Sequence, residues 1–294
     1  MSRPTAPDGA WTSRKLLDWT AGHLERKGVD SPRLAAEMLL AHVLETPRIQ
    51  LYADLDRPAG PLERAAFREL VERAAAHEPV QYLVGVAHFF SMRFEVADDV
   101  LIPRPSTETL VEHVIQHARR TPGFRQPAIA DLGAGSGAIA VALAKHLPES
   151  RVVATDLSPQ ALAVARRNAE RHGVTDRIDF REGPLFEPLS GRFEYLCANP
   201  PYIGDAEWAQ LPPNVRDYEP RDALYGGPDG LAVIRPLILG AARRLASPGQ
   251  LLVEIAASQK SHALDLAQQA EGLANPRVLA DAEGHPRVLV ADHL

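Results

Sequence analysis

The sequence predicts an α/β protein in which a doubly wound, mostly parallel sheet follows a small all-α domain. Residues 11–78 place apolar side chains at helical spacing, whereas residues 80–102 carry short apolar runs typical of strands. From residue 128 onward, strand-like and helix-like segments alternate, as in parallel strands joined by helical crossovers. A chain of 294 residues is long for one hydrophobic core, so we expect two domains.

Three amphipathic helices are expected in the first part of the chain. Thr12 and Ser13 are suitable caps for the first, Ser31 before Pro32 starts the second, and Pro61 opens the third. The apolar residues expected to face the core of a small bundle are Leu16, Leu17, Trp19 and Leu24, then Ala35, Leu39, Leu40 and Val43, then Ala65, Leu70, Val71 and Ala74. This bundle either recognises a substrate or only stabilises the protein, and its sequence leaves both open.

A β-hairpin is expected between the bundle and the sheet. Residues 89–92 and 94–96 predict its two short strands, and the apolar residues 100–102 lead into Pro103-Arg104-Pro105. Thr107 is then expected to cap a helix with Leu110 on its buried face.

The remaining segments predict the sheet and its covering helices. We expect strands over residues 128–132, 151–156, 178–182, 195–198 and 251–255, with helices over 136–147, 158–172, 231–245 and 261–269. Residues 277–279 and 287–291 predict two last strands. Because only a short loop joins them, they should pair antiparallel at one edge.

Composition narrows the class of function. The net charge is −6 with no basic tail or stripe, which argues against nucleic acid as a partner. No apolar run approaches the roughly 18–20 residues that span a bilayer, and the polar first ten residues do not resemble a signal peptide. The histidines lack metal-ligand spacing, so no metal site is expected.

The lone cysteine, Cys197, excludes an internal disulfide and fits a reducing cytoplasm. Cys197 is either a nucleophile or, more simply, a small buried strand residue.

The most informative motif is Asn199-Pro200-Pro201-Tyr202, which directly follows an apolar, strand-like segment. An Asn side chain offers a carbonyl acceptor, and two prolines remove two backbone donors, so the Pro200 carbonyl can face a ligand. With the flat Tyr ring, these groups suit a planar –NH2 group, whose two protons need two acceptors. The simpler alternative is a Pro-Pro turn after a strand.

A glycine-rich loop, formed by Gly133, Ala134, Gly135, Ser136 and Gly137, leaves one strand and enters a helix. Glycine lets such a loop turn tightly and approach a nucleotide-like cofactor. Asp156 ends the next strand, where its carboxylate can accept both hydroxyls of a ribose. The alternative for Asp156 is a cap at the start of the following helix.

Both NAD and S-adenosylmethionine satisfy this loop, but hydride transfer has no use for a clamp on an amide nitrogen. Methyl transfer to such a nitrogen does need one, because its lone pair is delocalised and the nitrogen is a poor nucleophile. Acceptors on both N–H groups orient it and favour the positive charge that develops there.

The chain resembles the HemK/PrmC-like peptide chain release factor N5-glutamine methyltransferases over nearly its whole length. The matching residues are Glu78-Pro79, Gly85, Leu101-Ile102-Pro103-Arg104-Pro105, Thr107-Glu108, residues 131–140, Asn199-Pro200-Pro201-Tyr202-Ile203, Glu254-Ile255, Asp281, Gly284 and Pro286-Arg287-Val288. Asn-Pro-Pro-Tyr is shared with adenine-N6 methyltransferases, whereas Ile-Pro-Arg-Pro is more specific to this family.

The resemblance implies a seven-stranded, Rossmann-like class I methyltransferase domain over residues 104–294. A helical substrate-recognition domain (1–84) and a β-hairpin linker (85–103) would precede it. The implied reaction moves a methyl group from S-adenosylmethionine to the glutamine amide nitrogen in the Gly-Gly-Gln motif of class I release factors. A cytoplasmic monomer without membrane or direct nucleic-acid contacts is expected.

The resemblance also implies roles for individual residues. Asn199, Pro200 and Tyr202 would be catalytic, and the same residues with Pro201 would bind the substrate amide. The cofactor would be held by Gly133, Ala134, Gly135, Ser136, Gly137, Asp156, Leu185 and Asn199. Arg104 and Pro105 would shape the wall between the domains.

Two positions depart from the family pattern. Ser106 stands where the family often has Asp, and Pro184 stands where an acidic residue commonly lies near the adenine. Leu185 would still pack on the adenine ring. Two alternative targets remain: glutamine in a ribosomal protein, and adenine in nucleic acid, which would need base flipping and a basic channel.

Overall fold

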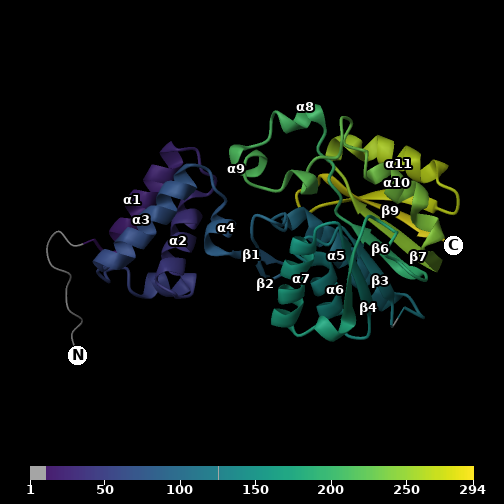
Figure 1. The fold of residues 1–294 in the computed structure, drawn as a ribbon, viewed down its shortest axis with the longest axis horizontal. Coiled ribbons are helices and arrows are strands. Elements are labelled where there is room, and N and C mark those ends of the chain that lie inside the picture. Colours follow the sequence, from purple (N-terminus) through teal and green to yellow (C-terminus); the bar gives the residue numbers. More distant parts are fainter. Residues whose placement is uncertain (1–10, 125) are drawn as a thin grey trace. The chain divides into compact units, whose positions relative to one another are not determined.

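The computed structural model describes residues 11–124 and 126–294, which form two compact units (Figure 1). The helical unit contains the described residues up to Gly85 together with Pro213–Tyr218. The α/β unit contains Val86–Pro212 and Glu219–Leu294.

One apolar core holds the helical unit together. It lies among α1 (Ser13–Arg26), α2 (Pro32–Val43), α3 (Pro61–Ala75), α4 (Val80–Val84) and a 3₁₀ helix at Arg48–Ala53. The unit also includes the short helix α9 (Pro213–Arg216), which has no buried residue. Leu17, Leu24, Leu39, Leu40 and Phe67 are buried in this core.

Three expectations for these helices need correction. Trp19 is 52 % exposed and its ring stacks on His23, and Ala65 is exposed while Phe67 takes the buried place on α3. Val43 and Leu70 are partly buried and pack against the core, as expected. Ser31 precedes α2 but makes no side-chain cap, since its backbone is left-handed with φ 47°.

The α/β unit opens with the hairpin β1 (Val86–Phe89) and β2 (Met92–Glu95), an antiparallel pair. Its strands begin and end earlier than the apolar pattern predicts, because Phe90 and Ser91 form the turn with positive φ. Phe89 and Phe94 are buried in the core beneath the sheet.

Seven strands then form one mixed sheet in the order β5-β4-β3-β6-β7-β9-β8. Their bounds are β3 (Ala128–Leu132), β4 (Arg151–Asp156), β5 (Ile178–Glu182), β6 (Phe193–Ala198), β7 (Leu245–Glu254), β8 (Ala274–Ala280) and β9 (Pro286–His293). The first five run parallel, and β9 pairs antiparallel with both β7 and β8. The expected antiparallel pair at one edge is therefore confirmed.

Helices cover both faces of the sheet (Figure 1). One face packs on the hairpin, α5 (Glu108–Arg120) and α6 (Ala138–His146), with one buried alanine of α7 (Pro159–His172). The other packs on α10 (Ile234–Gly240) and α11 (Lys260–Gln269). The expected helix over residues 231–245 is shorter, ending as α10 and a 3₁₀ turn at Ala241–Arg243 before β7 starts.

Further short helices lie in the connecting segments: α8 (Asp205–Trp208) and 3₁₀ turns at Pro105–Thr107, Thr175–Arg177, Arg221–Ala223 and Ala257–Gln259. Among the described helices, none combines the length and hydropathy needed to cross a lipid bilayer. The described residues also include no cluster of three or more His, Cys, Asp or Glu side chains that could hold a metal ion.

Candidate functional site

The order of the strands places the candidate site beyond the carboxyl ends of β3 and β6. The chain runs outward from β3 to β4 and β5, then returns to β6 on the other side of β3, which makes this pair the topological switch point. Ligands of open α/β sheets bind at such a point. Leu132 pairs with Ala198 in the parallel register, so the residues that follow, Gly133 and Asn199, start side by side.

The glycine loop turns through left-handed backbone conformations. Gly133, Gly135 and Gly137 have φ of 76°, 54° and 78°, which side chains rarely adopt. A Cβ added at Gly137 would lie 2.9 Å from the Ala165 Cβ, so α6 can approach α7 only with glycine here. At Gly133 and Gly135 no heavy atom of the described residues, apart from the glycine itself and its two chain neighbours, lies within 4 Å of such a Cβ, which leaves room for a ligand against the backbone.

Asp156 ends β4 as expected and faces the glycine loop. Its Oδ2 accepts the Gly135 N–H at 2.8 Å, and its Oδ1 accepts the Ser158 N–H at 2.9 Å. Ser158 itself caps α7 through the Ala161 N–H. The carboxylate thus supports both the loop and the start of the helix, and its contact with a ribose stays a prediction.

Asp131, near the end of β3, connects that strand to the first turn of α6. It is fully buried, its Oδ2 accepts the Ala140 N–H at 2.9 Å, and its Oδ1 has no hydrogen-bond partner within the described residues. Burial raises the pKa of Asp131 to about 7, against the opposing effect of the Ala140 N–H.

Leu185 and Pro184 lie just after β5, the neighbour of β4. Asp156 pairs with Glu182 at the ends of the two strands, and the Gly183 N–H donates to the Asp156 carbonyl at 2.9 Å. Leu185 has φ 44° and is partly buried against the apolar cluster on the α10 side. Leu185 and Asp156 therefore both lie at the carboxyl ends of their neighbouring strands, β5 and β4.

The Asn199–Tyr202 segment is held in shape by a glycine-rich loop that the sequence reasoning missed. A Cβ at Gly226 would lie 2.6 Å from the Pro201 carbonyl oxygen, and one at Gly230 would clash with the Tyr202 carbonyl oxygen. Gln259 Nε2 donates to the same Tyr202 carbonyl at 2.9 Å. The signal was present in the sequence as Gly226-Gly227 and Gly230.

The Tyr202 side chain is partly buried against the α10 side of the sheet. Burial, with a smaller effect of the Glu254 carboxylate, raises its pKa well above the ordinary tyrosine value. Tyr202 is therefore a neutral phenol at physiological pH and offers a ring face rather than a base.

The Asn199 side chain is anchored by residues from two other segments. Its Nδ2 donates to Thr107 Oγ1 at 3.2 Å, and Thr107 Oγ1 donates to Glu254 Oε2 at 2.6 Å. Thr107 was expected to cap α5, but its side chain makes no cap and instead joins this network. In the sequence, Thr107 and Glu254 were marked as site residues only by being among the residues that match the family.

Arg104 is also fixed by a buried acid. Its guanidinium donates to Glu219, which additionally accepts the Ile102 N–H at 3.2 Å. Burial raises the pKa of Glu219 and Arg104 opposes that rise. The pair ties the Ile-Pro-Arg-Pro segment to the chain after Tyr218.

Cys197 is not available as a nucleophile. Its side chain is fully buried on the α6 side of β6, and burial raises the pKa of its thiol well above normal. The reading as a small buried strand residue is confirmed.

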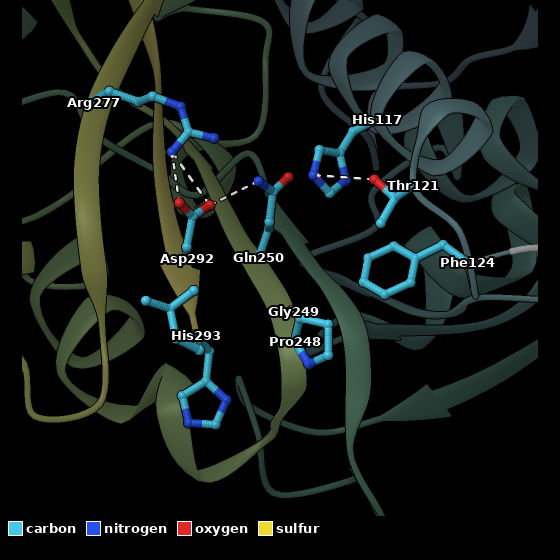
Figure 2. A pocket seen from close by; sticks show the side chains of 10 residues that line it. His117, Thr121, Phe124, Pro248, Gly249, Gln250, Arg277, Asp292 and His293 are labelled. Carbon is cyan, nitrogen blue, oxygen red and sulfur yellow. Dashed lines mark hydrogen bonds and ion pairs between the residues drawn. The ribbon is translucent and has the colours of Figure 1, made fainter.

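A separate pocket lies near the opposite end of β7 (Figure 2). Its volume is about 280 Å³, and its polar groups satisfy one another: Gln250 and Arg277 both donate to Asp292. His117 Nδ1 pairs with the Tyr195 hydroxyl at 2.7 Å. This pocket contains none of the expected site residues.

Known proteins match both units of the chain. Residues 15–85 match the PrmC N-terminal domain, and residues 105–210 match the methyltransferase small domain. A release factor glutamine methyltransferase from Rhodopirellula baltica is 41 % identical over 97 % of this chain and 97 % of its own length. One from Geobacter sulfurreducens is 48 % identical over 87 % and 88 %.

The chain belongs to the release factor glutamine methyltransferase family. As a member of this family it is a methyltransferase. Solved structures agree on the fold. A Thermus thermophilus 16S rRNA methyltransferase, in complex with AdoMet and guanosine, has a TM-score of 0.50 at 19 % identity, covering 71 % of this chain and 50 % of that one. A methyltransferase from Pyrococcus furiosus has a TM-score of 0.50 at 17 % identity, covering 78 % and 98 %.

Proposed function

We propose that this protein transfers a methyl group from S-adenosylmethionine to a glutamine side-chain amide nitrogen in class I peptide chain release factors, within their Gly-Gly-Gln motif. The observation that carries the proposal is the meeting of the glycine loop and Asn199 at the switch point, through the Leu132–Ala198 pair. Relatives named release factor glutamine methyltransferase match nearly the full chain.

The residues at this edge of the sheet suit S-adenosylmethionine. Open space above Gly133 and Gly135 admits a ligand to the loop backbone, and Asp156 offers carboxylate oxygens beside it. The residues that would hold the cofactor are Gly133, Ala134, Gly135, Ser136, Gly137, Asp156, Leu185 and Asn199. When bound, S-adenosylmethionine supplies an activated methyl group on a sulfonium, open to in-line attack.

The chain's own part in the reaction is to orient a weak nucleophile. Asn199 Oδ1 and the Pro200 carbonyl would accept the two N–H protons of the glutamine amide, while the Tyr202 ring holds the amide plane. Pro201 fixes the backbone between them, with the Gly226 contact behind it. These acceptors favour positive charge on the nitrogen, so the site contributes orientation and electrostatics rather than a strong base.

The remaining features are proposed with the same function. Residues 1–84 would recognise the release factor, 85–103 would link the domains, and 104–294 would carry the chemistry. The enzyme would act as a monomer in the cytoplasm, where translation takes place, without binding nucleic acid directly.

A transfer assay tests the substrate. Labelled S-adenosylmethionine would be incubated with the enzyme and, separately, a release factor, the same factor with its motif glutamine replaced, a ribosomal protein, and DNA. We expect label only in the intact release factor. Label in the ribosomal protein or DNA, with none in the release factor, would refute the proposal.

A further inference from the structure

Glu254 is a fully buried carboxylate beside the proposed catalytic asparagine. It is the last residue of β7, and because Ala198 pairs with Val253 in the parallel register, Glu254 and Asn199 follow at the same level. Burying a carboxylate is costly unless hydrogen bonds satisfy it. Glu254 is not among the residues proposed to hold the cofactor or the glutamine amide.

Both Glu254 oxygens accept hydrogen bonds from hydroxyl groups of one short segment. Ser106 Oγ donates to Oε1 at 3.0 Å, and Thr107 Oγ1 donates to Oε2 at 2.6 Å. Ser106, which departs from the family pattern, thereby gains a role as the second donor. Thr107 Oγ1 also lies 3.2 Å from Asn199 Nδ2, so three side chains form a line from Glu254 to Asn199.

The direction of the hydrogen bonds along this line follows from proton counting. An ionised carboxylate only accepts, so the single hydroxyl proton of Thr107 must point to Glu254. Thr107 Oγ1 then has only lone pairs directed at Asn199, so Asn199 must donate to it through its NH2 group. The carbonyl of Asn199 is left on the opposite side of the amide, free for another donor.

Burial raises the pKa of Glu254 above its ordinary value, and the hydrogen bonds from Thr107 and Ser106, with the positive charges of Arg287 and Arg104, oppose that rise. Both carboxylate oxygens accept a hydroxyl proton, which is the hydrogen-bond pattern of an ionised carboxylate. Tyr202 also faces this carboxylate, as a neutral phenol.

We propose that Glu254 is a positioning residue that, through Thr107, sets which end of the Asn199 amide faces the substrate. With Glu254 ionised, Oδ1 of Asn199 is presented to the glutamine N–H. With the amide reversed, an NH2 group would meet the substrate NH2 group, donor against donor, and the clamp would fail. The assignment rests on the proposed function, because it requires Asn199 to accept from the glutamine amide.

Glu254→Gln tests the relay directly. A Gln amide can donate to Thr107, which releases the Thr107 proton to point at Asn199 and removes the constraint on the amide. We expect kcat for release-factor methylation to fall roughly 10- to 100-fold, as when an orienting partner behind a functional group is lost. The KM for the release factor and the Kd for S-adenosylmethionine should change less than about threefold, because the cofactor contacts remain.

Variants of Thr107 separate orientation from packing. Thr107→Val removes the hydroxyl at nearly constant volume and should lower kcat as much as Glu254→Gln does. Thr107→Ser keeps the hydroxyl and should restore kcat to near the wild-type value. Glu271→Gln makes the same charge change at an exposed position and is the matched control. In an Asn199→Ala background, Glu254→Gln should cause no further loss.

Three results would overturn the assignment: an unchanged kcat in Glu254→Gln, equal impairment in Thr107→Ser and Thr107→Val, or a full additional loss from Glu254→Gln in the Asn199→Ala background. Failure of the proposed function is a different result. In that case the wild-type enzyme itself would transfer no label to the release factor, and the positioning role would fall with it.

Discussion

At the scale of single residues, the site depends on polar atoms whose direction is set by their neighbours. Asn199 donates to Thr107 and so has its carbonyl to offer, whereas Asp156 already accepts two backbone N–H groups. We therefore expect different effects when the two side chains are truncated. Loss of the Asn199 side chain should lower turnover, and loss of the Asp156 side chain should lower the affinity for the cofactor.

Asn199→Ala removes one of the two acceptors proposed for the glutamine amide. We expect kcat to fall by roughly 100-fold or more, the size seen when a preorganised polar group is removed from a reacting centre. Binding of S-adenosylmethionine, measured by calorimetric titration, should survive, because the glycine loop and Asp156 remain. Methylation at the wild-type rate would reject the role of Asn199.

Asp156→Ala removes the carboxylate proposed to hold the ribose. We expect the Kd for S-adenosylmethionine to rise roughly 10- to 100-fold, since hydrogen bonds to a charged group contribute about 1.5–3 kcal/mol. Ser158→Ala is the control: it removes the α7 cap and should lower Tm, at a cost of about 1 kcal/mol, without changing this Kd. An unchanged Kd in Asp156→Ala would limit Asp156 to supporting the loop and α7.

At the scale of elements, the sheet brings together the loops that follow β3 and β6, and the loop that contains Gly226 supports the one after β6. The Asn199–Tyr202 segment follows β6 and is bridged to the chain near Gly226, where the Ile203 N–H donates to the Leu224 carbonyl at 2.9 Å and the Gly226 N–H donates to Ile203 at 2.9 Å. Gly226 approaches Pro201 closely, and the Gln259 side chain donates to the Tyr202 carbonyl at 2.9 Å. The shape of the clamp therefore depends on the loop that contains Gly226 as well as on Gln259.

Gly226→Ala should show this dependence. The added methyl group would lie 2.6 Å from the Pro201 carbonyl oxygen and 2.7 Å from that of Gly230, so the backbone must shift. We expect a loss of about 1–3 kcal/mol in unfolding free energy and a fall in kcat of at least roughly tenfold.

Gly22→Ala provides the matched control for that variant. Gly22 lies inside α1, where alanine is favoured over glycine by roughly 0.5–1 kcal/mol, so Tm should hold or rise and kcat should not change. Equal kcat in Gly226→Ala and the wild type, measured by the methyl-transfer assay, would show that the loop behind Pro201 does not shape the clamp.

At the scale of the whole molecule, the sequence predicted the strands of the sheet better than it predicted which side chains contact one another. Parallel strands inside the sheet are short and apolar, so β3, β4 and β6 could be located from the sequence. The order of the strands, which defines the switch point, comes from the structure. The Thr107–Glu254 bond joins residues separated by 147 positions and depends on the register of β7 beside β6. Helical periodicity likewise could not show that Trp19 stacks on His23 outside the core.

The helical unit is proposed to recognise a whole release factor, and not only its tripeptide motif. The helical unit exposes large apolar side chains, among them Ile49 at 76 % and Leu62 at 87 %. If this unit binds the factor, replacing both with serine should raise the KM for the intact factor by roughly fivefold or more, since burying one such side chain contributes about 1.5–3 kcal/mol. Steady-state kinetics with the intact factor and with a short Gly-Gly-Gln peptide would measure the effect.

The peptide is the decisive comparison, because it reaches only the reacting centre. Its kcat/KM should be the same for wild type and the Ile49→Ser/Leu62→Ser variant, and Leu239→Ser, an exposed change on α10, should affect neither substrate. An equal loss on peptide and intact factor would mean that the substitutions disturb folding or chemistry. No loss on either substrate would remove Ile49 and Leu62 from substrate recognition.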